Sequence, residues 1–169
     1  MFKKIFRKWK RWNLKGKQME FERKLSFHNF KTARSCMIFW VESDIPFDKV
    51  ERLKNLLSEH MNVDALVFLE PGRSLPVIPK TLCVNEDGIS YSGKFSDSKL
   101  KGCVENAYDL WIDLSLKPNV LPDYIVRNSR AKCKIGMGRS SFENDIIFED
   151  VNDIDTFTER ISRLLSKVN

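Results

Sequence analysis

The stretch Cys36-Met37-Ile38-Phe39-Trp40-Val41 is the longest uninterrupted apolar run in this chain of 169 residues. A run without alternating polar positions is typical of a strand that is buried on both faces of a parallel sheet. Residues 63–69 and 110–114 are also largely apolar, and residues 47–61 carry apolar side chains at helical spacing. Strands that alternate with helices favour a mainly parallel sheet with helices on both faces. We therefore predict one α/β domain, three-layered and Rossmann-like, over residues 35–169.

The shorter elements are predicted from turn and capping signals. Strand pieces are expected at residues 81–84, 89–91, 132–135 and 145–148. Helices are expected from Ser96 or Asp97 to Asn106, and from Asn119 to Arg130. The last helix is expected to begin near residues 153–156, where Thr156-Phe157-Thr158-Glu159 matches a capping box.

The start of the chain has a different pattern. Its first seventeen residues carry eight Lys or Arg and no acidic residue. When they are wound at about 100° per residue, the apolar side chains share an arc of roughly 120°, formed by Phe2, Ile5, Phe6, Trp9 and Trp12. The opposite arc is cationic and holds Lys3, Lys4, Arg7, Lys8, Lys10 and Arg11. We predict a basic amphipathic helix over residues 1–16 and a polar connector over residues 17–34.

The charge of the chain is unevenly distributed. Residues 1–34 hold twelve basic and two acidic side chains, a balance of +10, whereas residues 35–169 hold seventeen basic and twenty-one acidic ones, a balance of −4. A mildly acidic domain therefore follows a strongly basic arm. Such asymmetry indicates attraction of the arm to an anionic surface, either lipid headgroups or nucleic acid.

Three hypotheses for the arm remain open at this point. The helix can lie in the headgroup region of an anionic membrane, where both its apolar and its cationic residues are used. It can instead neutralise the phosphates of RNA, including ribosomal RNA, with Trp9 or Trp12 stacked on bases. In the third hypothesis the apolar stripe packs on its own domain or on a partner protein, and the cations face solvent.

Membrane crossing and secretion are not expected. The longest apolar run is far shorter than the roughly 20 residues that span a bilayer. The basic start also lacks the continuous apolar stretch of a signal peptide. The four cysteines Cys36, Cys83, Cys103 and Cys133 form no CxxC pair, which favours buried, reduced thiols. We expect a cytoplasmic protein that is held on the inner face of the membrane.

The chain as a whole resembles a family of short uncharacterised bacterial proteins, a domain of unknown function. The resemblance rests on the basic start, the strand near residue 36, the stretch Tyr108-Asp109-Leu110-Trp111-Ile112-Asp113-Leu114-Ser115 and the later segment Ser129-Arg130-Ala131-Lys132-Cys133-Lys134-Ile135-Gly136. It covers most of residues 27–169 and implies no activity.

A second resemblance is local. Residues 108–139, which run from YDLWIDLS to SRAKCKIGMGR, are similar to part of the N-terminal Rossmann-like half of heptosyltransferase-type glycosyltransferases. This similarity implies a Rossmann-like fold. The nucleotide-sugar half of those enzymes would require about another 150 residues, a typical domain length. The resemblance therefore argues against a complete transferase.

A possible ligand pocket is expected at the carboxyl end of the sheet, where open α/β folds bind ligands. It would be formed by Asp113, Ser115, Gly136, Gly138 and Arg139. Asp113 could bind a hydroxyl group or equally satisfy loop amides, and the glycine-rich stretch could hold a phosphate or simply form a turn. Neither GxGxxG nor GxxxxGK[ST] is present, and the two histidines lack metal-ligand spacing. We predict no catalytic residue, metal or cofactor.

The sequence therefore favours a non-enzymatic α/β module that is attached peripherally to an anionic surface, with the inner membrane as the first choice. An RNA- or ribosome-associated accessory protein is the alternative. A minimal sugar- or nucleotide-binding enzyme that uses Asp113 is a third.

Overall fold

The computed structural model describes residues 1–74, 77–138 and 143–167. Six strands form one sheet in the order β3-β2-β1-β4-β5-β6, and all five neighbouring pairs are parallel. The strands are β1 (Ser35–Val41), β2 (Asn62–Phe68), β3 (Thr81–Val84), β4 (Leu110–Asp113), β5 (Lys134–Met137) and β6 (Ile146–Phe148). This is the strand order of the Rossmann fold, so the predicted fold class is confirmed.

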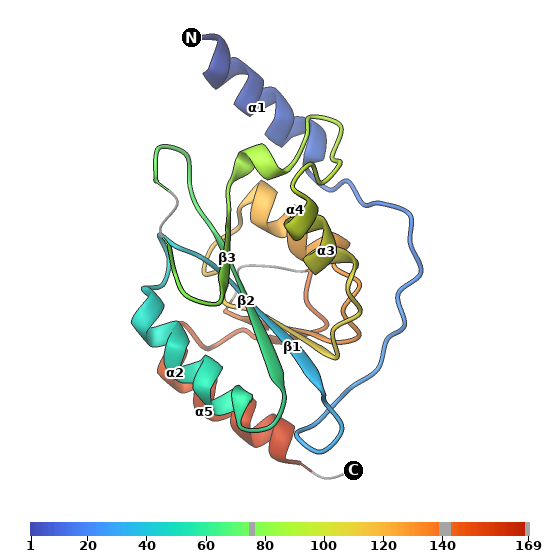
Figure 1. Cartoon of the computed structure of the whole chain (residues 1–169), viewed down its shortest axis with the longest axis vertical. Helices are drawn as coiled ribbons and strands as arrows, with labels where there is room; N and C mark the ends of the chain where they lie inside the picture. Colours follow the sequence, from blue (N-terminus) through green and yellow to red (C-terminus); the bar gives the residue numbers. More distant parts are fainter. Residues whose placement is uncertain (75–76, 139–142, 168–169) are drawn as a thin grey trace.

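Helices cover both faces of the sheet (Figure 1). They are α1 (Phe2–Leu14), α2 (Phe47–Ser58), α3 (Ser98–Glu105), α4 (Val120–Asn128) and α5 (Ile154–Ser166), with a short 3-10 helix η1 (Glu86–Gly88). One core cluster lies between the sheet and helices α2 and α5. The other lies between the sheet and helices α3 and α4. β1 contributes alternately to both, for example through Trp40 and Phe39, which explains its unbroken apolar sequence.

Three local predictions are wrong. Residues 89–91 form no strand, because Ile89 makes only an isolated antiparallel bridge to Phe95 across a tight turn. β5 begins at Lys134, two residues later than expected. The capping box is also absent, since Asp153 caps α5 by accepting a hydrogen bond from the Thr156 amide at 2.8 Å. An Asp cap three residues earlier extends the helix by most of a turn and brings Ile154 into its buried face.

The connector, residues 17–34, is fully described and contains no helix or strand. It runs along the edge of the domain and is held by backbone contacts: the Ser26 amide donates to the Lys132 carbonyl at 3.1 Å and the Phe30 amide to the Leu165 carbonyl at 2.9 Å. Arg23 adds a hydrogen bond to the Ala131 carbonyl and an ion pair with Asp145. The arm is therefore fastened to the domain along its length.

All four cysteines are free, as predicted. Cys36 and Cys133 are buried, whereas Cys83 and Cys103 are only half-buried. Burial raises the pKa of the Cys103 and Cys133 thiols to about 11. These thiols are therefore protonated at neutral pH and poor nucleophiles.

Candidate functional site

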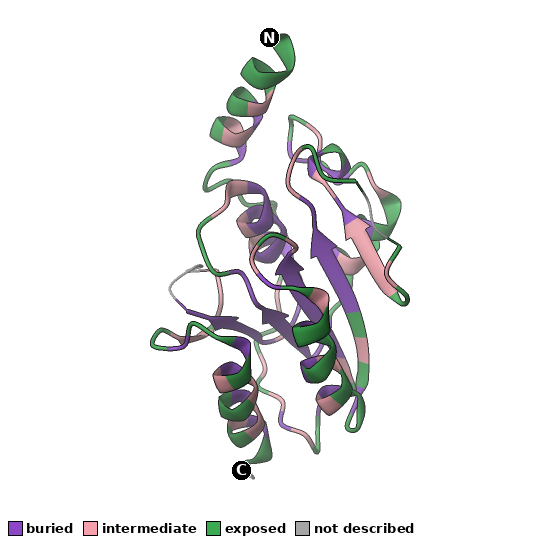
Figure 2. Cartoon of the chain, turned by 90° about the vertical axis from the view of Figure 1, so that its left-hand side faces the viewer, coloured by how far each residue is buried: buried purple, intermediate pink, exposed green. Residues whose placement is uncertain are grey.

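Most of the surface of the apolar stripe of α1 is exposed. Its five members are strongly exposed: Phe2 at 76%, Ile5 at 58%, Phe6 at 50%, Trp9 at 53% and Trp12 at 75%. Figure 2 shows α1 extending from one end of the molecule, with most of its surface exposed. This exposure argues against the hypothesis that the stripe is buried on its own domain.

The domain contacts the charged side of α1 instead. Leu14 is fully buried in the core cluster of α3 and α4, and Lys10 is 6% exposed. The Lys10 ammonium donates to the Glu86 carbonyl and lies 5.5 Å from the centre of the Tyr91 ring. Desolvation lowers the pKa of Lys10, although the charges of Glu86 and Asp87 oppose this effect. The buried Lys10 thus anchors α1 to the domain through polar contacts, in addition to the apolar packing of Leu14.

Two arginines also hold α1 against the domain. Arg7 forms an ion pair with the Glu86 carboxylate, and Arg11 lies 3.8 Å from the Glu70 carboxylate. Glu70 follows the end of β2 and Glu86 follows the end of β3. α1 is thus held against the carboxyl ends of these two strands, and carboxylates on the domain explain why the cationic side of the helix faces inward.

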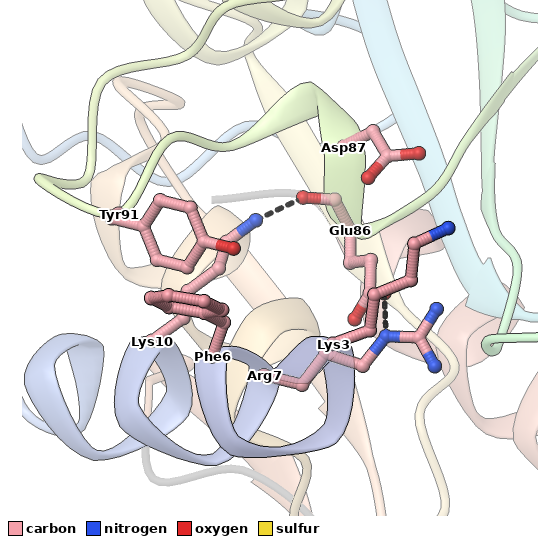
Figure 3. Close-up of a pocket in the computed structure, with 7 residues that line it drawn as sticks. All are labelled: Lys3, Phe6, Arg7, Lys10, Glu86, Asp87 and Tyr91. Carbon is pink, nitrogen blue, oxygen red and sulfur yellow. Dashed lines mark hydrogen bonds and ion pairs between the residues drawn. The ribbon is translucent and has the colours of Figure 1, made fainter. Parts of the chain in front are cut away.

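A pocket of about 230 Å³ lies between α1 and η1 (Figure 3). Its lining residues are Lys3, Phe6, Arg7, Lys10, Glu86, Asp87 and Tyr91. Tyr91 makes an edge contact with Phe6, with ring centres 5.9 Å apart, and a tilted contact with Trp9 at 6.0 Å. Tyr91 therefore extends the exposed stripe. No sequence signal pointed to this role, because residues 89–91 were expected to form a strand.

The remaining cations of the arm are available to a ligand. Lys3, Lys4 and Lys8 are exposed and form no ion pair with any residue in the described part of the chain. Of the eleven predicted contact residues, eight are thus exposed, although Phe6 and Trp9 also contact Tyr91, whereas Arg7, Lys10 and Arg11 form polar contacts with the domain.

The turn that carries Tyr91 joins α1 to α4. The Asn13 amide group donates to the Tyr91 carbonyl at 2.8 Å, and the Lys17 ammonium donates to the Ser92 carbonyl at 2.6 Å. From α4, the Tyr124 hydroxyl donates to the Gly93 carbonyl at 2.6 Å. This junction fixes the position of the exposed stripe relative to the sheet.

The Tyr124→Phe variant should have a free energy of unfolding about 1 kcal/mol lower than the wild type, because the buried Gly93 carbonyl loses its donor. Urea denaturation measures the difference. Tyr91→Phe, which removes an exposed hydroxyl, is the matched control and should change stability by less than about 0.5 kcal/mol. Equal stability of the two variants would show that the hydrogen bond from Tyr124 to the Gly93 carbonyl contributes nothing to the free energy of unfolding.

Two residues of the predicted pocket at the carboxyl end of β4, Asp113 and Ser115, are buried and hydrogen-bonded within the described part of the chain. Asp113 is 0% and Ser115 1% exposed. One carboxylate oxygen of Asp113 accepts hydrogen bonds from the Ser115 hydroxyl at 2.6 Å and the Ser115 amide at 3.0 Å. The other oxygen accepts from the Asn144 amide group at 2.9 Å. Desolvation raises the pKa of Asp113, and these hydrogen bonds oppose the shift in part.

The glycines of the predicted pocket have structural roles. Asn144 covers Gly136 so closely that a Cβ atom at this position would lie 2.4 Å from the Asn144 nitrogen. Gly138 has a φ of +71°, which favours glycine, and it follows the end of β5. Arg139 lies outside the described residues. The pairing of β4 with β5 therefore brings Asp113 and Gly136 together, and the Asn144 side chain contacts both of them.

The loop after β1 lacks the features of a dinucleotide site. Rossmann enzymes place a glycine-rich turn and a pyrophosphate there. This chain has Glu42 and Asp44 at that position, with Pro46 before α2. Carboxylates would repel a pyrophosphate. In the part of the chain that the structure describes, no group of His, Cys, Asp or Glu is arranged to hold a metal ion.

A family model matches almost the whole chain. Its description is a family of unknown function (DUF6913), and the match covers residues 3–168. No curated protein and no solved structure matches the chain. The local similarity of residues 108–139 to heptosyltransferases therefore stays a prediction. No helix among the described residues is long and apolar enough to cross a membrane.

Proposed function

The chain belongs to the DUF6913 family of unknown function, and we propose that it is a non-enzymatic α/β module held on an anionic membrane surface by α1. We place it on the cytoplasmic side of the inner membrane. The observation that carries this proposal is the exposure of the whole apolar stripe on a helix that is itself firmly seated. An exposed contiguous apolar patch of this kind marks an interaction site.

The energetics favour a bilayer as the partner. Full burial of one large apolar side chain contributes about 1.5–3 kcal/mol, so partial burial of five contributes several kcal/mol. Each cation near an anionic headgroup adds about 1 kcal/mol, and Lys3, Lys4 and Lys8 carry no competing ion pair among the described residues. A single myristoyl chain alone binds membranes only marginally. The stripe and the lysines together would contribute more membrane-binding free energy than one myristoyl chain.

The surroundings of α1 count against RNA. Glu70, Glu86 and Asp87 lie beside the helix, and the domain from residue 35 onward has a negative balance of charge. A nucleic acid that followed the cations of α1 would meet these carboxylates, whereas dedicated nucleic-acid domains usually extend a basic surface. An RNA or ribosomal partner, and a protein partner for the stripe, are therefore outcomes of the test below.

The test is fractionation of lysed cells that express the full chain or a truncated protein lacking residues 1–17. We expect the full chain in the membrane pellet and the truncated protein in the supernatant, because α1 supplies both the apolar and the cationic contacts. In flotation with phosphatidylglycerol vesicles at low and high salt, the full chain should float with the vesicles and the truncated protein should not. Co-migration of the full chain with ribosomes, or identical behaviour of both proteins, would contradict the proposal.

A further inference from the structure

We propose that the turn Ser90–Lys94 is a second membrane-contacting element, which meets the same anionic bilayer as α1 and directs the carboxyl edge of the sheet toward it. This inference rests on the proposed attachment through α1. It adds a contact from a distant part of the chain and a defined orientation of the bound domain.

The turn is tightly closed and its tip is exposed. The Ser90 amide donates to the Lys94 carbonyl at 2.8 Å, and the Gly93 amide donates to the Ser90 carbonyl at 3.0 Å. Gly93 has a φ of +91°, and a Cβ atom there would lie 2.4 Å from the Tyr124 hydroxyl oxygen, so only glycine fits. This geometry leaves Tyr91 45% exposed and Lys94 exposed where the turn closes.

The turn and α1 present one continuous surface. The hydrogen bonds from Asn13 and Lys17 hold the turn against the C-terminal part of α1, and the Tyr91 ring contacts Phe6 and Trp9. Figure 3 shows the rings of Phe6 and Tyr91 side by side above the helix. Because Phe6 and Trp9 belong to the stripe, a bilayer that covers the stripe also reaches the Tyr91 ring.

The chemistry of the tip suits a lipid interface. Tyrosine has an apolar ring and a polar hydroxyl and is enriched at the level of the headgroups. The Lys94 ammonium makes no ion pair with any residue that the structure describes, so it is available to an anionic headgroup. The turn thus carries an exposed aromatic side chain and an exposed lysine, the two kinds of residue that also characterise α1.

The orientation follows from where α1 and the turn lie. α1 contacts Glu70 and Glu86, which follow the ends of β2 and β3. A bilayer against α1 and the turn therefore faces the carboxyl edge of the sheet. The C-terminal end of the chain lies at the opposite end of the molecule from α1 (Figure 1) and would point away from the membrane.

The test compares two charge reversals in the full chain, Lys94→Glu and Lys31→Glu. Lys31 is exposed beside Phe30, whose amide is bonded to Leu165 near the end of α5, and so it lies far from α1. With phosphatidylglycerol vesicles at low salt, Lys94→Glu should lower the affinity about ten-fold, because a positive charge near the headgroups becomes negative. Lys31→Glu should lower it less than about two-fold, because Lys31 lies near the end of α5, away from the surface that would meet the bilayer.

A second pair tests the aromatic contact. Tyr91→Ala should weaken binding about five-fold, and Phe27→Ala, which removes a comparably exposed ring at the other end of the domain, should leave it unchanged. Hydrogen exchange with and without vesicles supplies an independent readout, since the amides of Tyr91 and Ser92 at the exposed tip should become protected on binding.

The outcomes separate this inference from the proposed function. If Lys94→Glu and Tyr91→Ala bind vesicles like their controls while the full-length variant Trp9→Ala/Trp12→Ala loses binding, α1 acts alone and the second contact is wrong. If the full chain does not bind phosphatidylglycerol vesicles, or Trp9→Ala/Trp12→Ala binds equally well, the membrane proposal fails and the second contact fails with it.

Discussion

The double variant Trp9→Ala/Trp12→Ala should bind phosphatidylglycerol vesicles about a hundred-fold more weakly than the wild-type chain. Both rings are more than half exposed, so a bilayer can bury most of their surface. Partial burial of two such rings contributes about 3 kcal/mol, which corresponds to about a hundred-fold in affinity. Sedimentation of the protein with increasing amounts of vesicles measures the change.

The matched control for this prediction is Leu25→Ala/Phe27→Ala. It also removes two exposed apolar side chains, at 68% and 38% exposure, but from the connector. Its vesicle affinity should equal that of the wild type. The tryptophan variant should also keep the free energy of unfolding within about 0.5 kcal/mol, because the rings contact little of the domain. A large loss of stability together with unchanged vesicle binding would contradict both the structure and the proposal.

The same two tryptophans separate lipid from RNA. Binding to RNA depends chiefly on phosphate contacts, which the double variant retains in Lys3, Lys4 and Lys8. The variant Lys4→Glu/Lys8→Glu should therefore affect an RNA complex most. If the tryptophan variant loses binding to vesicles but keeps any binding to RNA, the result supports a membrane surface as the partner.

The fold was predictable because its decisive signals are local. β1 is an unbroken apolar run, since both of its faces are covered by helices. α2 begins directly after Pro46, as a proline before a helical apolar pattern indicates. The exact start of α5 was not predictable from one motif, because Asp153 and Thr156 are both acceptable caps and the burial of Ile154 decides between them.

The role of α1 in the site was only half predictable. Its sequence identifies two faces, but it does not say which face meets the domain. The answer depends on Glu70 and Glu86, which are brought to α1 only by the pairing of β2 and β3. Tyr91 was missed for the same reason, since its contacts with Phe6 and Trp9 join segments that are distant in the sequence.

The predicted ligand pocket illustrates a different limit. The sequence correctly places Asp113 at the end of a buried strand, and the strand pairing brings Gly136 beside it. What the sequence does not show is Asn144, which reaches over Gly136 and donates to Asp113. A side chain from a loop with no sequence motif thus supplies a direct partner of both Asp113 and Gly136.

The stability of the domain should rise between pH 7.5 and pH 9.5 through Lys134, a buried lysine at the start of β5. Lys134 is 2% exposed, and its ammonium donates to the Val126 carbonyl at 2.6 Å and the Arg127 carbonyl at 3.2 Å in the last turn of α4. Desolvation, helped by the charge of Arg23, lowers its pKa from 10.5 to about 7, against the attraction of Asp145 and Glu143. Between these two pKa values the unfolded chain holds a proton that the native protein has released. Stability therefore increases with pH over this range.

The Lys134→Met variant isolates this effect. Urea denaturation of both proteins at the two pH values should show that the wild type gains about 2–3 kcal/mol relative to the variant, at 1.36 kcal/mol for each pH unit. The comparison removes the opposite effect of the cysteines, because their raised pKa values lower stability at high pH equally in both proteins. Lys99→Met, a change at an exposed lysine, should follow the wild type. Parallel pH profiles of wild type and Lys134→Met would show that Lys134 keeps its proton, and that the end of α4 stabilises the charged form enough to offset its burial.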